Sequence, residues 1–146
     1  MLKEKQHRYD LAYMKMADAW SKLSYAKRMQ VGAIIVKDQQ IISDGFNGMP
    51  SGMDNCCEGS DGLTKREVLH AEANAICKLA RSTGSSEGAT LYCTLSPCVE
   101  CAKLILQSGI TRIIFRETYE DEAGILLLHN NRREVKGVRW RSSLST

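Results

Sequence analysis

The sequence lacks a long hydrophobic run, an internal repeat and a low-complexity segment. No stretch approaches the roughly 18 apolar residues that are needed to span a bilayer. The first ten residues, MLKEKQHRYD, also lack the apolar core of a secretory signal. These absences predict a cytoplasmic protein with no membrane partner.

Aromatic residues and net charge are also scarce. Only 6% of the 146 residues are aromatic and the formal charge is +3, whereas nucleic-acid binding favours a basic surface with stacking side chains. The basic residues near the C-terminus, which we interpret as a solvated face, are Arg132, Arg133, Lys136, Arg139 and Arg141. We therefore expect no nucleic-acid partner.

The rest of the composition is that of an ordinary globular protein, with 43% hydrophobic and 25% charged residues. A length of 146 residues suits one compact domain, 1–146. Without a secretory signal, the six cysteines favour a metal or catalytic site over a disulfide framework. They are Cys56, Cys57, Cys77, Cys93, Cys98 and Cys101.

The N-terminal part of the chain predicts a helix over about 7–27. Apolar side chains recur at helical spacing and are expected to face the core, with Lys and Asp residues on the opposite face. The expected core positions are Leu11, Met14, Ala17 and Trp20.

Further along, the pattern predicts five strands and three more helices. The polar KDQQ at 37–40 is short enough to join two strands as a hairpin, and the glycine-rich segment 47–65 predicts a long loop. The strands are expected at 31–36, 41–46, 89–94, 111–115 and 134–140, and the helices at 69–81, 98–107 and 120–130. This order predicts an α/β fold with helices on both faces of a mixed sheet.

Two short motifs at expected helix starts, HAE at 70–72 and PCVEC at 97–101, carry the residue types of a catalytic zinc site. Zinc prefers thiolate and imidazole ligands, and a catalytic site keeps three protein ligands and one open position. Two cysteines spaced by three lie on nearly the same side of a helical turn, where the helix dipole favours thiolates. We therefore expect His70, Cys98 and Cys101 to bind Zn²⁺.

Glu72 follows His70 by two residues and is expected to move protons rather than to bind the metal. Zinc can lower the pKa of a bound water from about 16 to about 7. A nearby carboxylate can accept that proton and return it to the ring nitrogen and the leaving amine. Because H-x-E paired with P-C-x-x-C is the general signature of zinc nucleobase deaminases, we predict that Glu72 is the catalytic proton shuttle.

Two other functions remain open. A deaminase of nucleic acid, acting on tRNA adenosine or on cytosine in single-stranded DNA, would use the same motifs. A non-catalytic, zinc-stabilised binding module would need a fourth ligand, for which Cys56, Cys57 and Cys93 are the candidates.

Over about residues 30–128 the sequence resembles the deoxycytidylate deaminases of the cytidine-deaminase superfamily. The resemblance is carried by the zinc motifs together with VGA at 31–33, GFNGMPSG at 45–52, HAEANAI at 70–76 and LILQSGI at 104–110. The GFNGMP segment discriminates most, because tRNA adenosine, polynucleotide cytidine and riboflavin-pathway deaminases share the zinc motifs.

The resemblance implies a three-layer α/β/α fold with a five-stranded mixed sheet. It implies hydrolysis of dCMP to dUMP and ammonia, which supplies dUMP for thymidylate synthesis. It also implies a homo-hexamer that is activated by dCTP together with Mg²⁺ and inhibited by dTTP.

The nucleotide contacts are expected on either side of the zinc motifs. The expected substrate-binding residues are Arg28, Asn47, Ala71, Ser96 and Tyr119, and the allosteric residues implied by the resemblance are Phe46, Asn47 and Gly48. Arg28, with its neighbour Lys27, suits a 5′-phosphate because arginine binds such oxygens bidentately. Each position also has a structural alternative, such as a turn at Asn47, a basic helix end at Arg28 or simple loop packing at Tyr119.

The remaining cysteines have other expected roles. Cys77 and Cys93 fall in a helix and a strand and are expected to be small core residues. Some phage members of the resembled family carry a second, structural zinc that uses cysteines of the long loop, so Cys56 and Cys57 are candidates. No histidine lies in that loop to complete such a site.

Overall fold

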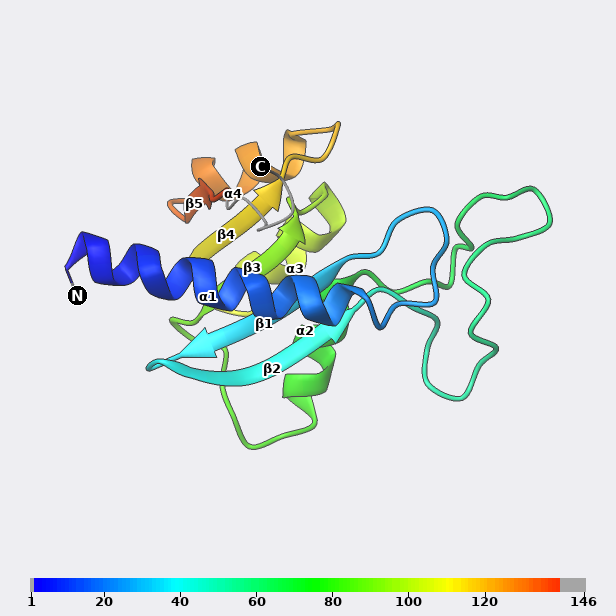
Figure 1. Ribbon diagram of the computed structural model, residues 1–146, viewed down its shortest axis with the longest axis horizontal. Coiled ribbons are helices and arrows are strands. Elements are labelled where there is room, and N and C mark those ends of the chain that lie inside the picture. Colours follow the sequence, from blue (N-terminus) through cyan, green and yellow to red (C-terminus); the bar gives the residue numbers. More distant parts are fainter. Residues whose placement is uncertain (1, 140–146) are drawn as a thin grey trace, which may run out of the picture.

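The computed structural model describes residues 2–139, in which a five-stranded sheet lies between helices (Figure 1). The elements follow the predicted order. They are α1 (Lys3–Ser21), β1 (Gly32–Lys37), β2 (Gln40–Phe46), α2 (Ala71–Ala80), β3 (Thr90–Leu95), α3 (Val99–Gln107), β4 (Arg112–Glu117), α4 (Ala123–Asn130) and β5 (Glu134–Gly137). The predicted strand end at Trp140 and the basic residue Arg141 lie outside the described residues.

The sheet is mixed, as predicted, with the strand order β2-β1-β3-β4-β5. β1 pairs antiparallel with both β2 and β3, whereas β4 runs parallel to both β3 and β5. The strands β2, β3, β4 and β5 therefore point in one direction and β1 in the other. The parallel pairs arise because α3 and α4 each cross over the sheet between two strands.

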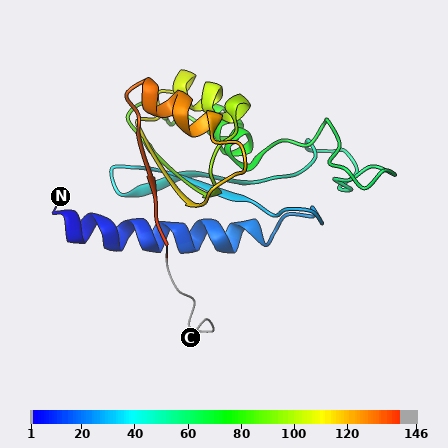
Figure 2. The ribbon, with the colours of Figure 1, turned by 90° about the horizontal axis from the view of Figure 1, so that it is seen from above.

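Helices cover both faces of the sheet, which gives the three layers implied by the resemblance (Figure 2). On one face, α1 packs through Tyr13, Met14 and Ala17 against Ile34, Tyr92 and Ile114. On the other face, α2, α3 and α4 enclose a larger core that is rich in Ala, Ile and Leu, from Ala71 to Leu128. None of the helices within residues 2–139 combines the length and apolar character that crossing a membrane requires.

The first helix differs from its prediction in both bounds. It begins at Lys3 and ends at Ser21, six residues before the predicted end. Beyond it, the Ser24 hydroxyl accepts a hydrogen bond from the Ala26 N–H and donates one to the Asn47 carbonyl oxygen. These local and long-range bonds turn the chain into a loop, because a serine side chain that bonds nearby backbone competes with helix continuation.

The expectation that the Asp residues of this helix face away from the core is wrong for Asp10, which is fully buried. Its carboxylate accepts hydrogen bonds from the Arg112 guanidinium (2.6 and 2.8 Å), the Tyr92 hydroxyl (2.6 Å) and the Gln6 amide (2.9 Å). Burial alone would raise the pKa of Asp10, but these donors lower it below its usual value. Arg112 lies 102 residues away in sequence, so helical periodicity alone cannot reveal the pair.

Candidate metal centre and active site

The candidate site lies where the carboxyl ends of three parallel strands meet. β2 ends at Phe46, β3 at Leu95 and β4 at Glu117, and the segments that follow these strands carry the chemistry-bearing residues. The opposite orientation of β1 places its first residues at the same edge of the sheet. Ligand sites in open α/β sheets form at this edge, because the loops after the parallel strands converge there.

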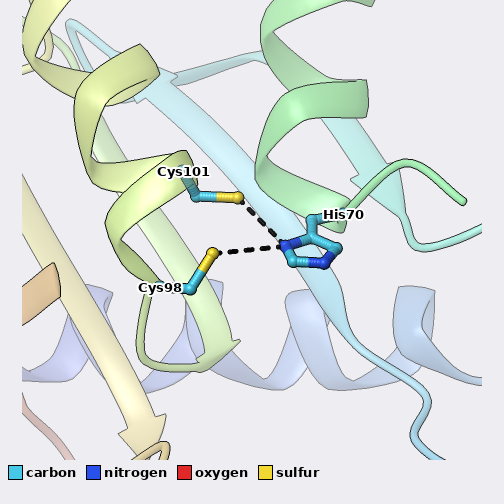
Figure 3. A group of neighbouring side chains, drawn as sticks. All are labelled: His70, Cys98 and Cys101. Carbon is cyan, nitrogen blue, oxygen red and sulfur yellow. Dashed lines mark hydrogen bonds between the residues drawn. The ribbon is translucent and has the colours of Figure 1, made fainter. Parts of the chain in front are cut away.

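The three expected metal ligands come together at the starts of two helices. His70 is the N-cap residue of α2, Cys98 is the N-cap residue of α3, and Cys101 lies in the first turn of α3. Their donor atoms all lie within 4.8 Å of one another. The His70 Nδ1 atom lies 3.3 Å from the Cys101 sulfur and 3.5 Å from the Cys98 sulfur (Figure 3).

The two thiols compete for one proton. Hydrogen bonds with Cys101 and then with His70 lower the pKa of Cys98 to about 3. The hydrogen bond with Cys98, together with burial, raises the pKa of Cys101 far above its usual value. Hydrogen bonding to Cys98 also raises the pKa of His70, although burial opposes the change. These contacts thus favour the thiolate form of Cys98 and concentrate electron-rich donors that a cation would bind.

The chemistry of this donor set fits Zn²⁺. One imidazole nitrogen and two sulfurs are preferred zinc ligands, and three protein donors leave a fourth position for a reactant. Cys101 is buried, Cys98 is half-buried and His70 is exposed, so the cluster is closed on the protein side and open toward the cavity. Among residues 2–139, no other group of three His, Cys, Asp or Glu donors lies close enough to hold a metal ion.

Glu72 lies in the first turn of α2 and is 4% exposed. Burial raises the pKa of its carboxyl above the usual value, although a hydrogen bond from its own backbone N–H and the nearby His70 oppose the change. Glu72 lines the same cavity as His70 and Cys98. A buried carboxyl with a raised pKa beside a metal cluster is suited to taking up and releasing a proton.

Two glycines allow the close backbone packing that holds these helices in place. A Cβ atom at Gly45 would lie 2.6 Å from the Ala71 carbonyl oxygen, so β2 approaches the start of α2 closely. A Cβ atom at Gly124 would lie 2.1 Å from the Pro97 carbonyl oxygen, directly before Cys98. The position of each ligand-bearing helix start therefore depends on a residue without a side chain.

A cavity of about 270 Å³ opens beside the cluster. It is lined by every residue that we predicted to contact substrate: Arg28, Asn47, Ala71, Ser96 and Tyr119. Arg28 and Tyr119 are exposed, whereas Ser96 and Ala71 are buried. The structure thus brings together residues from five segments of the chain around one space.

Two of these residues also have structural contacts. The Asn47 amide oxygen accepts a hydrogen bond from the Val31 N–H (2.9 Å), and its nitrogen donates to the Met29 carbonyl oxygen (2.7 Å). The Ser96 hydroxyl accepts a hydrogen bond from the Tyr119 N–H (2.7 Å). Asn47 therefore shapes one wall of the cavity, and Ser96 holds the backbone that carries Tyr119.

The other two residues of the expected allosteric set, Phe46 and Gly48, do not line this cavity. Gly48 forms a two-bond bridge with Leu69, the residue before His70, with N···O distances of 2.8 and 3.0 Å. The Phe46 carbonyl oxygen accepts a hydrogen bond from the Asn74 side chain of α2 (2.8 Å). These residues thus contact the helix that carries His70 and Glu72.

Sequence reasoning missed five further lining residues: Met29, Val31, Thr64, Val68 and Leu95. Leu95 could have been found from its place at the end of a predicted parallel strand. Thr64 and Val68 belong to the long loop, which returns to the cavity through bridges that no local pattern encodes. Met29 precedes β1 and had no distinguishing signal.

The remaining cysteines give one confirmed and one wrong expectation. Cys93 is fully buried, as predicted, but Cys77 is exposed, because it lies on the outer face of α2. In the long loop, the Cys57 sulfur contacts the Asn55 carbonyl oxygen at 3.5 Å and the Cys56 sulfur contacts that of Glu58 at 3.3 Å. Within residues 2–139, Cys56 and Cys57 belong to no three-donor cluster.

Comparison with known proteins adds a family to this geometry. The model of the cytidine and deoxycytidylate deaminase zinc-binding region matches residues 7–117. The deoxycytidylate deaminase of Enterobacteria phage T4 is 35% identical to this chain in an alignment that is 162 positions long. The alignment covers 76% of this chain and 84% of that protein. The deoxycytidylate deaminase of Saccharomyces cerevisiae is 33% identical over 132 residues, which cover 84% of this chain and 42% of that protein.

The fold also has a close counterpart among solved structures. The crystal structure of the dCMP deaminase from the cyanophage S-TIM5, in complex with dCMP and dUMP, superposes with a TM-score of 0.88 at 45% sequence identity. The match covers 94% of this chain and 99% of that one. The arrangement of helices and sheet described above therefore occurs in a protein of known structure and similar length.

Proposed function

Because the chain belongs to the cytidine and deoxycytidylate deaminase family and is a zinc-dependent hydrolase, we propose that it converts dCMP and water to dUMP and ammonia. One observation carries the choice of substrate: a single cavity is lined by two of the metal ligands, by Glu72 and by Arg28. A base could then lie at the metal while an anionic group reaches the arginine. The dUMP formed would supply thymidylate synthesis.

The metal would be held by His70, Cys98 and Cys101. Zn²⁺ bound there would supply a Lewis acid that makes a water molecule acidic near neutral pH. Glu72 would accept one proton from the attacking water and pass it to the ring nitrogen. It would then carry a second proton, released when the added hydroxyl group on the base becomes a carbonyl, to the departing amine, which leaves as ammonia. Its burial and raised pKa favour the protonated form that the second half of this cycle requires.

The remaining cavity residues would bind and orient the nucleotide. Arg28 would bind the 5′-phosphate through charge-assisted hydrogen bonds, which are strong and directional. Tyr119 would stack on or cover the nucleotide, because its ring is 39% exposed and its backbone is fixed by Ser96. Asn47 would contribute to sugar or phosphate binding through the wall that it holds at Met29 and Val31.

A steady-state assay with separate substrates tests the proposal. Purified protein would be assayed with dCMP, CMP, deoxycytidine and dCTP, and Arg28→Ala would serve as the phosphate-contact variant. We expect turnover of dCMP above all others, and a rise in the KM for dCMP in the variant. No turnover of any monomer would refute the proposal and direct attention to polynucleotides, for which a gel shift at physiological salt is the next assay.

We also propose regulation and assembly of the kind that the family resemblance implies. Binding of dCTP with Mg²⁺, or of dTTP, at Phe46, Asn47 and Gly48 would act on the metal site through the bridge between Gly48 and Leu69. The assembly would be a homo-hexamer. Adding dCTP or dTTP to the dCMP assay, with light scattering to measure the mass of the particle, tests both statements. An unchanged rate or a monomeric mass would refute the corresponding one.

A cytoplasmic location is part of the same proposal. All six cysteines lie within the described residues, and all are free thiols. Free thiols in this number are typical of a reducing compartment. Fractionation of the cells that produce the protein, followed by detection with an antibody, tests the location, and recovery in an oxidising compartment would refute it.

A further inference from the structure

The part of the cavity wall that carries Arg28 is held by a carboxylate from the long loop. Glu58 Oε2 accepts hydrogen bonds from the backbone N–H groups of Lys27 (3.0 Å) and Arg28 (3.3 Å). Glu58 lies 30 residues after Arg28 in sequence. The connection before β1 and the long loop after β2 project from the same end of the molecule (Figure 1).

The rest of this connection has other supports. Near its start, Ser24 donates to the Asn47 carbonyl oxygen (2.8 Å), and near its end Asn47 donates to the Met29 carbonyl oxygen (2.7 Å). Between these points, the backbone N–H groups of Lys27 and Arg28 donate to Glu58 and to no other acceptor in the described part of the chain. The backbone conformation at Arg28 therefore depends on this carboxylate.

Glu58 is also linked to a second residue that lines the cavity. It forms a β-bridge with Thr64, a residue that lines the cavity as Arg28 does. The turn between them is closed by backbone hydrogen bonds from Lys65 to Cys57 (2.7 Å) and from Gly59 to Leu63 (2.9 Å). Glu58 thus joins the arginine-bearing segment, through its side chain, to the loop segment that carries Thr64, through its backbone.

The position of Glu58 has a cost in free energy, because its second carboxylate oxygen is buried without a partner among the described residues. Oε1 is buried and has no hydrogen-bond partner among the described residues. Leaving a buried acceptor unpaired costs free energy, so such atoms in native structures call for an explanation beyond simple packing. A role in holding Arg28 provides that explanation.

We propose that Glu58 is a positioning residue that fixes the Arg28 backbone so that its guanidinium meets the 5′-phosphate of the substrate. The inference rests on the proposed function for its kinetic consequence, but not for the contact itself. Glu58 would act on phosphate recognition and not on the chemical step, because within residues 2–139 its side chain accepts hydrogen bonds from the Arg28 segment and from none of the metal ligands.

Kinetics of Glu58→Ala provide the first test. We expect the KM for dCMP to rise about tenfold, the effect of losing roughly one charge-assisted hydrogen bond, with kcat nearly unchanged. Turnover of deoxycytidine, which has no phosphate, should not change. Glu58→Gln retains an oxygen that can accept both N–H groups and should restore the wild-type KM. Glu67→Ala removes an exposed carboxylate from the same loop and is the matched control.

A double-mutant cycle with Arg28→Ala separates positioning from general stability. If Glu58 acts through Arg28, Glu58→Ala should not raise the KM further once Arg28 is absent. The inference is overturned if the two effects multiply, if dCMP and deoxycytidine lose turnover equally, or if Glu58→Ala behaves like Glu67→Ala.

Amide hydrogen exchange tests the contact without any activity. The Lys27 and Arg28 amides should exchange about tenfold faster in Glu58→Ala than in the wild type or in Glu67→Ala, because opening of a locally held segment controls exchange. Unchanged exchange overturns the inference. If the wild type fails to turn over dCMP, the proposed function fails, and this measurement still decides whether Glu58 holds the segment.

Discussion

Replacing Asp10 by alanine should strongly destabilise the protein without changing its chemistry. Asp10 is fully buried and neutralises Arg112, whose side chain is 15% exposed. Removing one partner of a buried ion pair costs about 3–5 kcal/mol. The lower end of this range applies here, because Arg112 keeps a second ion pair, in which its Nε atom lies 2.9 Å from Glu134 Oε2. A loss of about 3 kcal/mol corresponds to a fall in Tm of about 10 °C for a chain of this size.

Denaturant unfolding at equal protein concentrations measures this loss, and Glu134→Ala is the matched control. Glu134 pairs with the same arginine, but its side chain is 61% exposed, so its removal should cost less than about 1 kcal/mol. The kcat of Asp10→Ala should match the wild type below the transition, since Asp10 lies on the α1 face of the sheet and the metal ligands begin helices on the other. Equal losses in the two variants would refute the reasoning.

The same pair predicts how the loss depends on pH. Hydrogen bonds from Arg112, Tyr92 and Gln6 outweigh burial and lower the folded-state pKa of Asp10 below 3.8. The unfolded chain therefore binds this proton first as pH falls, and the stabilisation by Asp10 is complete above about pH 5 and shrinks at lower pH. The difference in unfolding free energy between wild type and Asp10→Ala should be constant from about pH 5 to 8 and smaller near pH 3. A difference that grows on acidification would contradict this sign.

Three further predictions concern the site itself. Glu72→Gln should retain one zinc per chain by elemental analysis and lower kcat by about 10²–10⁴-fold; more than about a tenth of the wild-type rate would exclude proton transfer by Glu72. Removing zinc with a chelator should abolish turnover while the far-ultraviolet circular dichroism persists, because two apolar cores stabilise the fold. Loss of the helical signal together with the metal would indicate a structural zinc site. Gly124→Ala places a Cβ atom 2.1 Å from the Pro97 carbonyl oxygen and should displace the segment before Cys98. Because small shifts around a metal site commonly weaken metal binding about tenfold or more, we expect at least that loss of zinc affinity in a chelator competition. Unchanged affinity would mean that α4 moves instead.

The sequence predicts the order of the helices and strands and the grouping of the three metal-ligand candidates well, because both depend on short-range sequence patterns. Strand and helix periodicities repeat within a few residues, and the Cys98 and Cys101 spacing places two sulfurs on one helical turn regardless of the rest of the fold. The end of α1, the burial of Asp10 and the support of Arg28 by Glu58 are different. Each depends on a partner between 23 and 102 residues away, and only the folded chain brings these partners together.

Cys77 illustrates a second limit. A helix of ten residues buries one stripe, and the pattern of Ala and Leu in α2 assigns that stripe to Ala71, Ala75 and Leu79. Cys77 falls outside it, on the solvent side. Residue type alone favoured burial, but the orientation of the helix decides exposure.

The contact between Asp10 and Arg112 also sets an order of events during synthesis on the ribosome. The first helix emerges with its carboxylate and the apolar side chains of Tyr13 and Met14, yet its ion-pair partner follows 102 residues later. At about 5–20 residues per second, this delay is on the order of ten seconds. During that time the Asp10 carboxylate has no arginine to neutralise it, although the apolar partners Ile34 and Val36 are already synthesised. The helix therefore leaves the ribosome well before the arginine that completes its buried ion pair.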